Sequence, residues 1–286
     1  MTKEEKYLKL VLLMIKDTKG PELKNKFIEL GSSITEEQID EMIVAPFVQH
    51  LRYPTEHGFI GYDTWPVNGE SMTSMQSLEF LHRAAKDVID RKIEGDIVET
   101  GVWKGGSIIA MKAAFDLYGD INRKFYVCDS FEGCPPLNVY NVEINGVIND
   151  HGDRHYMMSR LSISEEDVVE NFKKYSLLDD RVIIVKGWFH NTMPVVAKHI
   201  EKISILRLDG DMYISTKPVL DELYDKLQPG GYFITDDVGL ANHDRAIEEF
   251  RKKHNITTPL IRARGNDDSI DRLETNEGYV HYWIKE

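Results

Sequence analysis

From Gly95 onward, short apolar segments alternate with longer amphipathic ones, and this alternation restricts the possible fold more than any other feature of the chain. Brief apolar runs indicate buried strands, whereas apolar residues recurring at helical spacing indicate helices. Strict alternation of the two builds a parallel sheet covered by helices on both faces. The expected strands are 96–99, 124–129, 181–186, 203–209 and 232–236, and the expected helices are 107–118, 164–175, 216–227 and 243–254.

The alternation ends near the C-terminus, where two expected strands, 259–263 and 278–285, are joined by a loop alone. Strands connected in this way form a hairpin, so we expect the sheet to end in an antiparallel pair. The run Pro229-Gly230-Gly231 is expected to stop the helix before it. The sequence therefore predicts an α/β fold whose sheet is mostly parallel and carries a C-terminal antiparallel hairpin.

Residues 1–90 lack this alternation and are expected to form helices joined by irregular stretches. Ser33 with Glu36 indicates a capped helix start, and regularly spaced apolar residues predict a helix over 78–89. The stretch 53–69, which is rich in proline, glycine and aromatic residues, is expected to be a loop or lid. The apolar run 10–15 is far shorter than the roughly 20 residues of a membrane span and predicts a packed helix, which a subunit contact could cover. We therefore divide the chain into a helical cap, 1–90, and a core, 91–286.

The composition is acidic and poor in cysteine. With 35 Lys and Arg against 48 Asp and Glu, the formal net charge is -13, which disfavours binding to nucleic acid or to an anionic membrane. The two cysteines, Cys128 and Cys134, are too few for a secreted disulfide framework and lack zinc-site spacing. We therefore expect a cytoplasmic protein with neither a nucleic-acid nor a membrane partner.

The first expected strand of the core ends in a glycine-rich turn. Glu99, Thr100 and Gly101 are followed, after three further residues, by Gly105-Gly106-Ser107 at the start of a helix. Ligands of open parallel sheets bind beyond the carboxyl ends of the strands, where glycines allow close approach to the backbone. The spacing differs from the G-x-G-x-x-G fingerprint of dinucleotide enzymes. The turn predicts a cofactor site, although glycines required only for tight packing would give the same pattern.

The next two strands end in residues suited to a nucleoside. Asp129 ends the second strand at the offset expected of a carboxylate that binds both hydroxyls of a ribose, although alone it could be a helix cap or a surface charge. After the third strand, Gly187 permits close approach, and Trp188 could pack near an adenine or be buried in the core. The glycine turn and Asp129 together favour the cofactor interpretation.

Four aspartates follow the fourth and fifth strands. Asp209 and Asp211 come directly after one strand, and Asp236 and Asp237 end the next. Capping and surface ion pairs could explain one acidic strand end, but two facing ones would repel each other unless a cation neutralised them. Oxygen ligands of this kind suit a divalent cation such as Mg²⁺. A bound metal polarises a weakly acidic hydroxyl, and a nearby carboxylate can take its proton.

Four ordered motifs resemble the macrocin O-methyltransferase family, over roughly 95–256. They are E-T-G-V-W-K-G-G at 99–106, D-S-F-E-G at 129–133, L-D-G-D-M-Y at 208–213 and G-G-Y-F-I-T-D-D at 230–237. Members of this family methylate sugar hydroxyls on antibiotics such as macrolides and aminocoumarins. The resemblance implies a class I methyltransferase fold, S-adenosylmethionine and Mg²⁺, with Mn²⁺ as an alternative because both ions suit oxygen ligands.

The resemblance also implies roles for single residues. Glu99 and Gly101 would lie by the methionine part of the cofactor, with Thr100, Ser107, Gly187 and Asp209 as further cofactor contacts. Asp129 and Ser130 would contact the ribose, and Trp188 the adenine. Asp209, Asp236 and Asp237 would hold the metal, and Asp211 would be the general base, so that Asp209 and Asp211 form the catalytic pair. Family members are usually homo-oligomers in which the N-terminal segment helps close the site.

Two regions depart from the family pattern. The helix after Asp237 opens with Asn242-His243-Asp244-Arg245 in place of a Cys-Arg start, and the polar stretch 138–160 carries His151 and His155, which are more simply solvated loop residues. We expect both regions to border the acceptor. The sequence therefore predicts a metal-dependent methyltransferase acting on a sugar hydroxyl, with three alternatives: a catechol or phenol O-methyltransferase, a nicotinamide-dependent oxidoreductase and a non-catalytic binding module.

Overall fold

A seven-stranded sheet forms the centre of the protein in a computed structural model that describes residues 2–16, 19, 21–45, 68–135, 161–263 and 280–286. The strand order is β3-β2-β1-β4-β5-β7-β6. The first five strands pair in parallel, whereas β7 runs antiparallel to both β5 and β6. The predicted α/β fold and its antiparallel C-terminal pair are confirmed.

The elements have the following bounds. The strands are β1 (Asp96–Thr100), β2 (Phe125–Asp129), β3 (Val182–Lys186), β4 (Ile203–Leu208), β5 (Leu227–Thr235), β6 (Ile261–Arg262) and β7 (His281–Ile284). The helices that follow the N-terminal region are α4 (Met75–Asp90), α5 (Gly106–Leu117), α7 (Glu165–Lys174), α8 (Phe189–Val196), α9 (Tyr213–Leu223) and α10 (Ala241–Lys253). The N-terminal helices are α1 (Lys3–Ile15), α2 (Pro21–Leu30) and α3 (Glu36–Val44), and single 3-10 turns span Gly31–Ser33 and Tyr224–Lys226.

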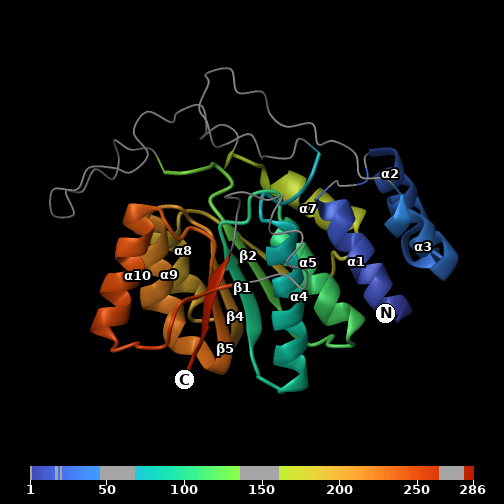
Figure 1. The fold of residues 1–286 in the computed structure, drawn as a ribbon. Helices are drawn as coiled ribbons and strands as arrows, with labels where there is room; N and C mark the ends of the chain where they lie inside the picture. Colours follow the sequence, from blue (N-terminus) through green and yellow to red (C-terminus); the bar gives the residue numbers. More distant parts are fainter. Residues whose placement is uncertain (1, 17–18, 20, 46–67, 136–160, 264–279) are drawn as a thin grey trace.

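The helices form layers on both sides of the sheet (Figure 1). Helices α8, α9 and α10 cover one face, and α1, α4, α5 and α7 cover the other, with α2 and α3 further out. Because side chains alternate along a strand, each strand contributes to both layers. In β1, for example, Ile97 belongs to the core beneath α4 and α5, whereas Val98 belongs to the core beneath α8 and α9.

The N-terminal helices extend the α4–α5 core. Leu10 to Ile15, the apolar run of α1, are all buried within this chain, and α1 packs against α3, α4 and α5. The start of α3 differs from the prediction, since its cap is Thr35 and not Ser33. The Thr35 hydroxyl accepts from the Gln38 amide, and the Gln38 side chain accepts from the Thr35 amide. This reciprocal pair is a capping box, and it places the helix start two residues later than predicted.

The sequence interpretation was wrong in two elements. The run Pro229-Gly230-Gly231 does not end a helix but lies inside β5, where the pairing with β4 is irregular. The Gly230 amide donates to the Lys285 carbonyl, so this irregular segment stays hydrogen-bonded to the C-terminal end of the chain. Helix α8 was not predicted, because it is short and contains Pro194.

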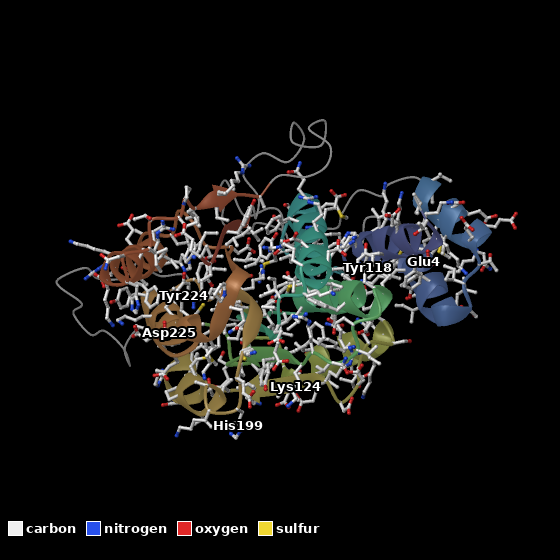
Figure 2. All side chains as sticks on the ribbon, turned by 90° about the horizontal axis from the view of Figure 1, so that it is seen from below. Glu4, Tyr118, Lys124, His199, Tyr224 and Asp225 are labelled. Carbon is white, nitrogen blue, oxygen red and sulfur yellow. The ribbon has the colours of Figure 1, made fainter. Side chains whose placement is uncertain are left out.

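The two ends of the sheet have different surroundings. Viewed from below, the labelled residues Lys124, His199 and Asp225 precede β2, β4 and β5 and mark the amino ends of the strands (Figure 2). The candidate site described next lies at the opposite, carboxyl end. None of the helices in the described part of the chain combines the length and hydropathy needed to cross a membrane.

Candidate functional site

The site lies at the end of β1, from which the sheet extends in two opposite directions. Strands β2 and β3 extend the sheet on one side of β1, whereas β4 and β5 extend it on the other. Ligands of open α/β sheets bind at such a switch point, beyond the carboxyl ends of the strands. Glu99 of β1 stands in register with Arg207 of β4, and Leu208 of β4 with Thr235 of β5. The strand order therefore brings the glycine turn and both aspartate pairs to one edge.

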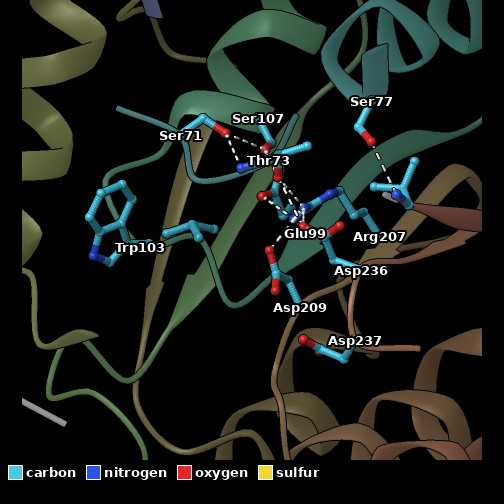
Figure 3. Close-up of polar contacts among 12 residues, drawn as sticks. Ser71, Thr73, Ser77, Glu99, Trp103, Ser107, Arg207, Asp209, Asp236 and Asp237 are labelled. Carbon is cyan, nitrogen blue, oxygen red and sulfur yellow. Dashed lines mark hydrogen bonds and ion pairs between the residues drawn. The ribbon is translucent and has the colours of Figure 1, made fainter. Parts of the chain in front are cut away.

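Arg207 lies at the centre of the acidic residues, fully buried (Figure 3). Its Nη1 donates to Glu99 at 2.8 Å, and its Nη2 donates to Asp209 at 2.8 Å and to Asp236 at 2.7 Å. Burial alone would lower the pKa of Arg207, but the neighbouring carboxylates outweigh it and raise that pKa. The four aspartates alone predict that a metal neutralises the cluster, whereas the protein itself supplies one positive charge.

One guanidinium does not offset the negative charge of this cluster. Burial raises the pKa of Glu99 to about 8, even though Arg207 opposes the shift. Burial and then the charge of Asp209 raise the pKa of Asp236 to about 7. Burial, followed by the charges of Asp211 and Asp209, raises the pKa of Asp237 well above its usual range. A further cation at this edge would stabilise the ionised carboxylates.

Two carboxylate oxygens of the cluster lack a hydrogen-bond partner. Glu99 Oε2 and Asp236 Oδ1 are buried and accept no hydrogen bond from any residue that the structure describes, which is costly unless a bound group satisfies them. As placed, no three His, Cys, Asp or Glu side chains among the described residues are grouped so that they could hold a metal ion. The donor set nevertheless suits Mg²⁺ or Mn²⁺, since Asp209, Asp236 and Asp237 offer oxygen ligands alone.

Asp211 is not among the carboxylates bonded to Arg207, and its backbone is left-handed, with φ of 58°. Its amide donates to Asp237 Oδ2 at 2.9 Å, and its carboxylate accepts from the Cys134 thiol at 3.6 Å. Burial, reinforced by the charge of Asp209, raises the pKa of Asp211 to about 6. A carboxylate with such a pKa is a better proton acceptor near neutral pH than an ordinary aspartate.

The glycine turn is shaped by close contacts within the chain. A Cβ on Gly101, whose φ is 83°, would lie 1.7 Å from the Asp209 carbonyl oxygen. A Cβ on Gly106 would lie 2.4 Å from the Glu70 carbonyl oxygen, which accepts the Gly106 amide at 2.9 Å. Both glycines are therefore required by tight packing of the site, whether or not a ligand also approaches them.

Asp129 organises the same turn from the end of β2. Its Oδ2 accepts from the amides of Val102 at 2.8 Å and Trp103 at 3.4 Å, and its Oδ1 accepts from the Phe131 amide at 2.9 Å. The turn therefore depends on a carboxylate at this position. The Ser130 hydroxyl donates to the Gly133 carbonyl at 2.7 Å, within the following turn.

The other expected cofactor residues lie around this turn and at the end of β3. Thr100 is buried and its carbonyl accepts from the Asp209 amide. The Ser107 hydroxyl donates to Thr73 at 3.4 Å. The Gly187 amide donates to the Asp129 carbonyl, which ties the end of β3 to β2. Trp188 precedes α8 and is partly exposed, so its ring is not a fully buried core side chain.

Sequence reasoning missed two residues of the site, Arg207 and Thr73. Thr73 donates to Asp236 Oδ2 at 2.9 Å and accepts from Arg207 at 3.1 Å, although it lies far from every recognised motif. The interruption of an apolar strand by Arg207 was an available signal, because a charged residue within a buried strand needs partners. Nothing in the polar sequence around Thr73 distinguishes it.

His243, expected in a region that borders the acceptor, lies inside the protein, 3.7 Å from Asp237. Its side chain is fully buried, and its two ring nitrogens are hydrogen-bonded to the hydroxyls of Thr216, at 2.9 Å, and Thr235, at 2.7 Å. Burial lowers the pKa of His243 to about 4. It joins α10 to α9 and to the end of β5 in neutral form. His151, His155 and the stretch 138–160 lie outside the described residues.

Comparison with known proteins identifies relatives of this architecture. The model of the macrocin O-methyltransferase (TylF) family matches residues 6–266, which extends beyond the region of the four motifs. The demethyldecarbamoylnovobiocin O-methyltransferase of Streptomyces niveus is 38% identical over 202 residues, covering 69% of this chain and 73% of that protein. The mycinamicin III 3''-O-methyltransferase of Micromonospora griseorubida is 32% identical over 222 residues, covering 78% and 85%.

A solved structure agrees with these sequence matches. The O-methyltransferase NovP superposes with a TM-score of 0.71 at 31% identity, covering 99% of both chains. This likeness extends over the N-terminal helices as well as the sheet.

Proposed function

The chain belongs to the macrocin O-methyltransferase family and is an S-adenosylmethionine-dependent O-methyltransferase, and on that premise we propose that it methylates a sugar hydroxyl of a glycosylated small molecule with the help of a divalent cation. The observation that carries the metal part is the excess of buried and partly buried carboxylates around Arg207 at the β1–β4 switch point. The sugar part rests on relatives that act on glycosylated natural products.

We assign the cofactor to the side of the switch point formed by β1 and β2. S-adenosylmethionine supplies the electrophilic methyl group on its positively charged sulfonium. Glu99 Oε2, buried and unpartnered, suits a positively charged part of that ligand. Thr100, Gly101 and Ser107 would face it from the turn, with Asp129 and Ser130 toward its ribose and Gly187 and Trp188 toward its adenine.

We assign the acceptor hydroxyl to the side formed by β4 and β5. Asp209, Asp236 and Asp237 would hold Mg²⁺ or Mn²⁺, which when bound acidifies a coordinated hydroxyl. Asp211 would take the proton of that hydroxyl, as its raised pKa allows. Arg207 keeps the carboxylates in fixed orientations through its bonds to Asp209 and Asp236.

We further propose that residues 1–90 cap the core and that the chain functions as a homo-oligomer. Thr73 supports the first point, because it reaches the acidic cluster from a segment outside the core. Size-exclusion chromatography coupled to light scattering measures the assembly, and a monomeric mass would contradict the second point.

An acceptor screen with isotopically labelled S-adenosylmethionine tests the substrate class. We expect label transfer to deoxysugar-bearing glycosides with free hydroxyls, and none to their aglycones. Transfer to catechols and other phenols alone would contradict the sugar proposal while leaving the methyltransferase assignment intact. Full turnover after exhaustive chelation with EDTA would contradict the metal proposal.

A further inference from the structure

A short segment before α4, Gly69–Ser74, connects the N-terminal helices to the acidic cluster. We call it the bridging segment. Glu70, Ser71, Thr73 and Ser74 are all at most 3% exposed, although all four are polar. Buried polar side chains are retained where specific partners satisfy them. Glu70 anchors the segment to the N-terminal helices, and Thr73 contacts the candidate site.

The anchor is a buried ion pair between Glu70 and Lys24 of α2. The Lys24 ammonium lies 2.7 and 2.6 Å from the two carboxylate oxygens, and the Tyr175 hydroxyl donates to Glu70 at 2.7 Å. The Glu70 backbone is fixed as well, since its amide donates to Ile15 and its carbonyl accepts from Gly106. Lys174 also pairs with Glu70, but at 3.4 Å and from a side chain that is 43% exposed. Lys24 is therefore the buried partner of this carboxylate, and its removal weakens the hold on Glu70.

The site contact is the Thr73 hydroxyl. It donates to Asp236 Oδ2 at 2.9 Å and accepts from Arg207 at 3.1 Å and from Ser107 at 3.4 Å. Asp236 Oδ2 thus receives bonds from both Thr73 and Arg207, while Oδ1 is left without a partner. A carboxylate held through one oxygen presents the other in a fixed direction (Figure 3).

We propose that Thr73 is a positioning residue for Asp236, and that the Lys24–Glu70 ion pair holds Thr73 in place. This inference rests on the proposed function, in which Asp236 is a metal ligand. Hydrogen-bond partners of ligating carboxylates orient them, and their loss weakens metal binding or turnover. This series of contacts, from Lys24 through Glu70 and Thr73 to Asp236, therefore makes the site depend on helix α2. Helix α2 itself supplies none of the candidate site residues.

The Thr73 hydroxyl is tested by two matched substitutions. Thr73→Val keeps the shape of the side chain and removes the hydroxyl, whereas Thr73→Ser keeps the hydroxyl. Titration calorimetry with MnCl₂ in the presence of S-adenosylhomocysteine measures metal affinity, and kcat is measured with the first acceptor methylated in the screen. We expect Thr73→Val to weaken Mn²⁺ binding and lower kcat about tenfold or more, and Thr73→Ser to retain both within about threefold.

The anchor is tested by a double-mutant cycle. We expect Lys24→Met to weaken Mn²⁺ binding several-fold in the wild type but to have no further effect in Thr73→Val, because both act through one hydroxyl. Lys112→Met is the matched control, since Lys112, like Lys24, is a buried lysine in an ion pair, here with Asp116 and Asp179. It should lower stability without changing Mn²⁺ affinity.

Three results would overturn the inference: a Thr73→Val protein that behaves like the wild type, equal damage in Thr73→Ser, or effects of Lys24→Met and Thr73→Val that multiply. A wild type that methylates without binding Mn²⁺ contradicts only the metal proposal, and the cycle is then judged on kcat. A wild type that binds Mn²⁺ but methylates nothing contradicts the acceptor proposal, and the cycle is judged on affinity. A wild type that does neither overturns both.

Discussion

Replacing Arg207 with methionine should destabilise the protein strongly and in a pH-dependent way. The guanidinium is fully buried and makes three charge-assisted bonds, to Glu99, Asp209 and Asp236, besides its bond to Thr73. Methionine fills a similar volume but leaves these carboxylates without their cation. Breaking a buried ion pair from one side costs roughly 3–5 kcal/mol. For a chain of this size, the midpoint of thermal unfolding should fall by about 10 °C.

The pH dependence separates a charge effect from a packing defect. In the folded wild type, burial already raises the pKa of Glu99 to about 8 and that of Asp236 to about 7, and the charge of Arg207 opposes both shifts. Without Arg207 both pKa values rise further, so the folded variant keeps protons that the folded wild type loses as the pH rises, and its stability falls more steeply with pH. The loss in Arg207→Met should therefore be larger at pH 8 than at pH 5.5.

The assay is urea unfolding of the wild type, Arg207→Met and Arg207→Lys at both pH values. Arg207→Lys keeps a positive charge but not the planar fork, so it should recover part of the loss. The double variant Arg207→Met/Glu99→Gln removes one of the stranded charges and should be more stable than Arg207→Met at pH 8. A loss below about 1 kcal/mol, or one that is equal at both pH values, would refute the reasoning.

Three further predictions concern other parts of the chain. Gly101→Ala should lower the free energy of unfolding in urea by more than about 2 kcal/mol, because its Cβ would collide with the Asp209 carbonyl. Gly119 has a similar φ and no atom within 4 Å of where a Cβ would lie, so Gly119→Ala should lower it by about 1 kcal/mol. Equal losses in the two variants would contradict this prediction. Burial lowers the pKa of His82 to about 4. Below pH 6.5 the unfolded state therefore binds more protons than the folded state, and the free energy of unfolding should fall as the pH drops toward 4. Because the ring is partly exposed, we expect this loss to be about 2 kcal/mol. His82→Gln should lack that component, and an unchanged pH profile would contradict it. Asp211→Asn should lower kcat about a hundredfold while S-adenosylhomocysteine binding stays within about threefold, and a wild-type rate would exclude Asp211 as the base.

Much of the fold followed from the sequence because its signals are local. Alternation of short apolar runs with amphipathic segments predicted the order of strands and helices, and the loop between the last two strands predicted the antiparallel pair. The irregular part of β5 escaped prediction since Pro229, Gly230 and Gly231 are individually typical of a chain break. Its backbone is instead held by a hydrogen bond to Lys285, more than 50 positions later, which no local pattern reveals.

The candidate site was predictable only where its residues follow strands. Asp209 and Asp236 follow neighbouring strands, and parallel pairing then brings them together. Thr73 reaches Asp236 from 163 positions away through a hydrogen bond. A contact of this kind depends on tertiary packing of the bridging segment, so neither periodicity nor spacing indicates it.

The charge balance of the site leads to a last prediction. Five carboxyl groups, those of Glu99, Asp209, Asp211, Asp236 and Asp237, gather near one buried guanidinium. If a divalent cation completes this balance, it binds the folded protein and not the unfolded one, and at a hundred times its Kd it should add about 2.7 kcal/mol of stability.

The thermal midpoint of the wild type should therefore rise by about 5 °C or more on addition of MgCl₂ or MnCl₂, and return after EDTA. Asp236→Asn should abolish this shift, because it removes a charge and a ligand from the cluster. Asp221→Asn is the control, since Asp221 is an exposed carboxylate of α9 paired with Lys217, away from the cluster. It changes the net charge equally and should keep the full shift. Equal shifts in both variants would mean that the cation acts on the overall charge of the protein, and the absence of any shift in the wild type would leave Arg207 as the neutraliser on which the aspartates depend.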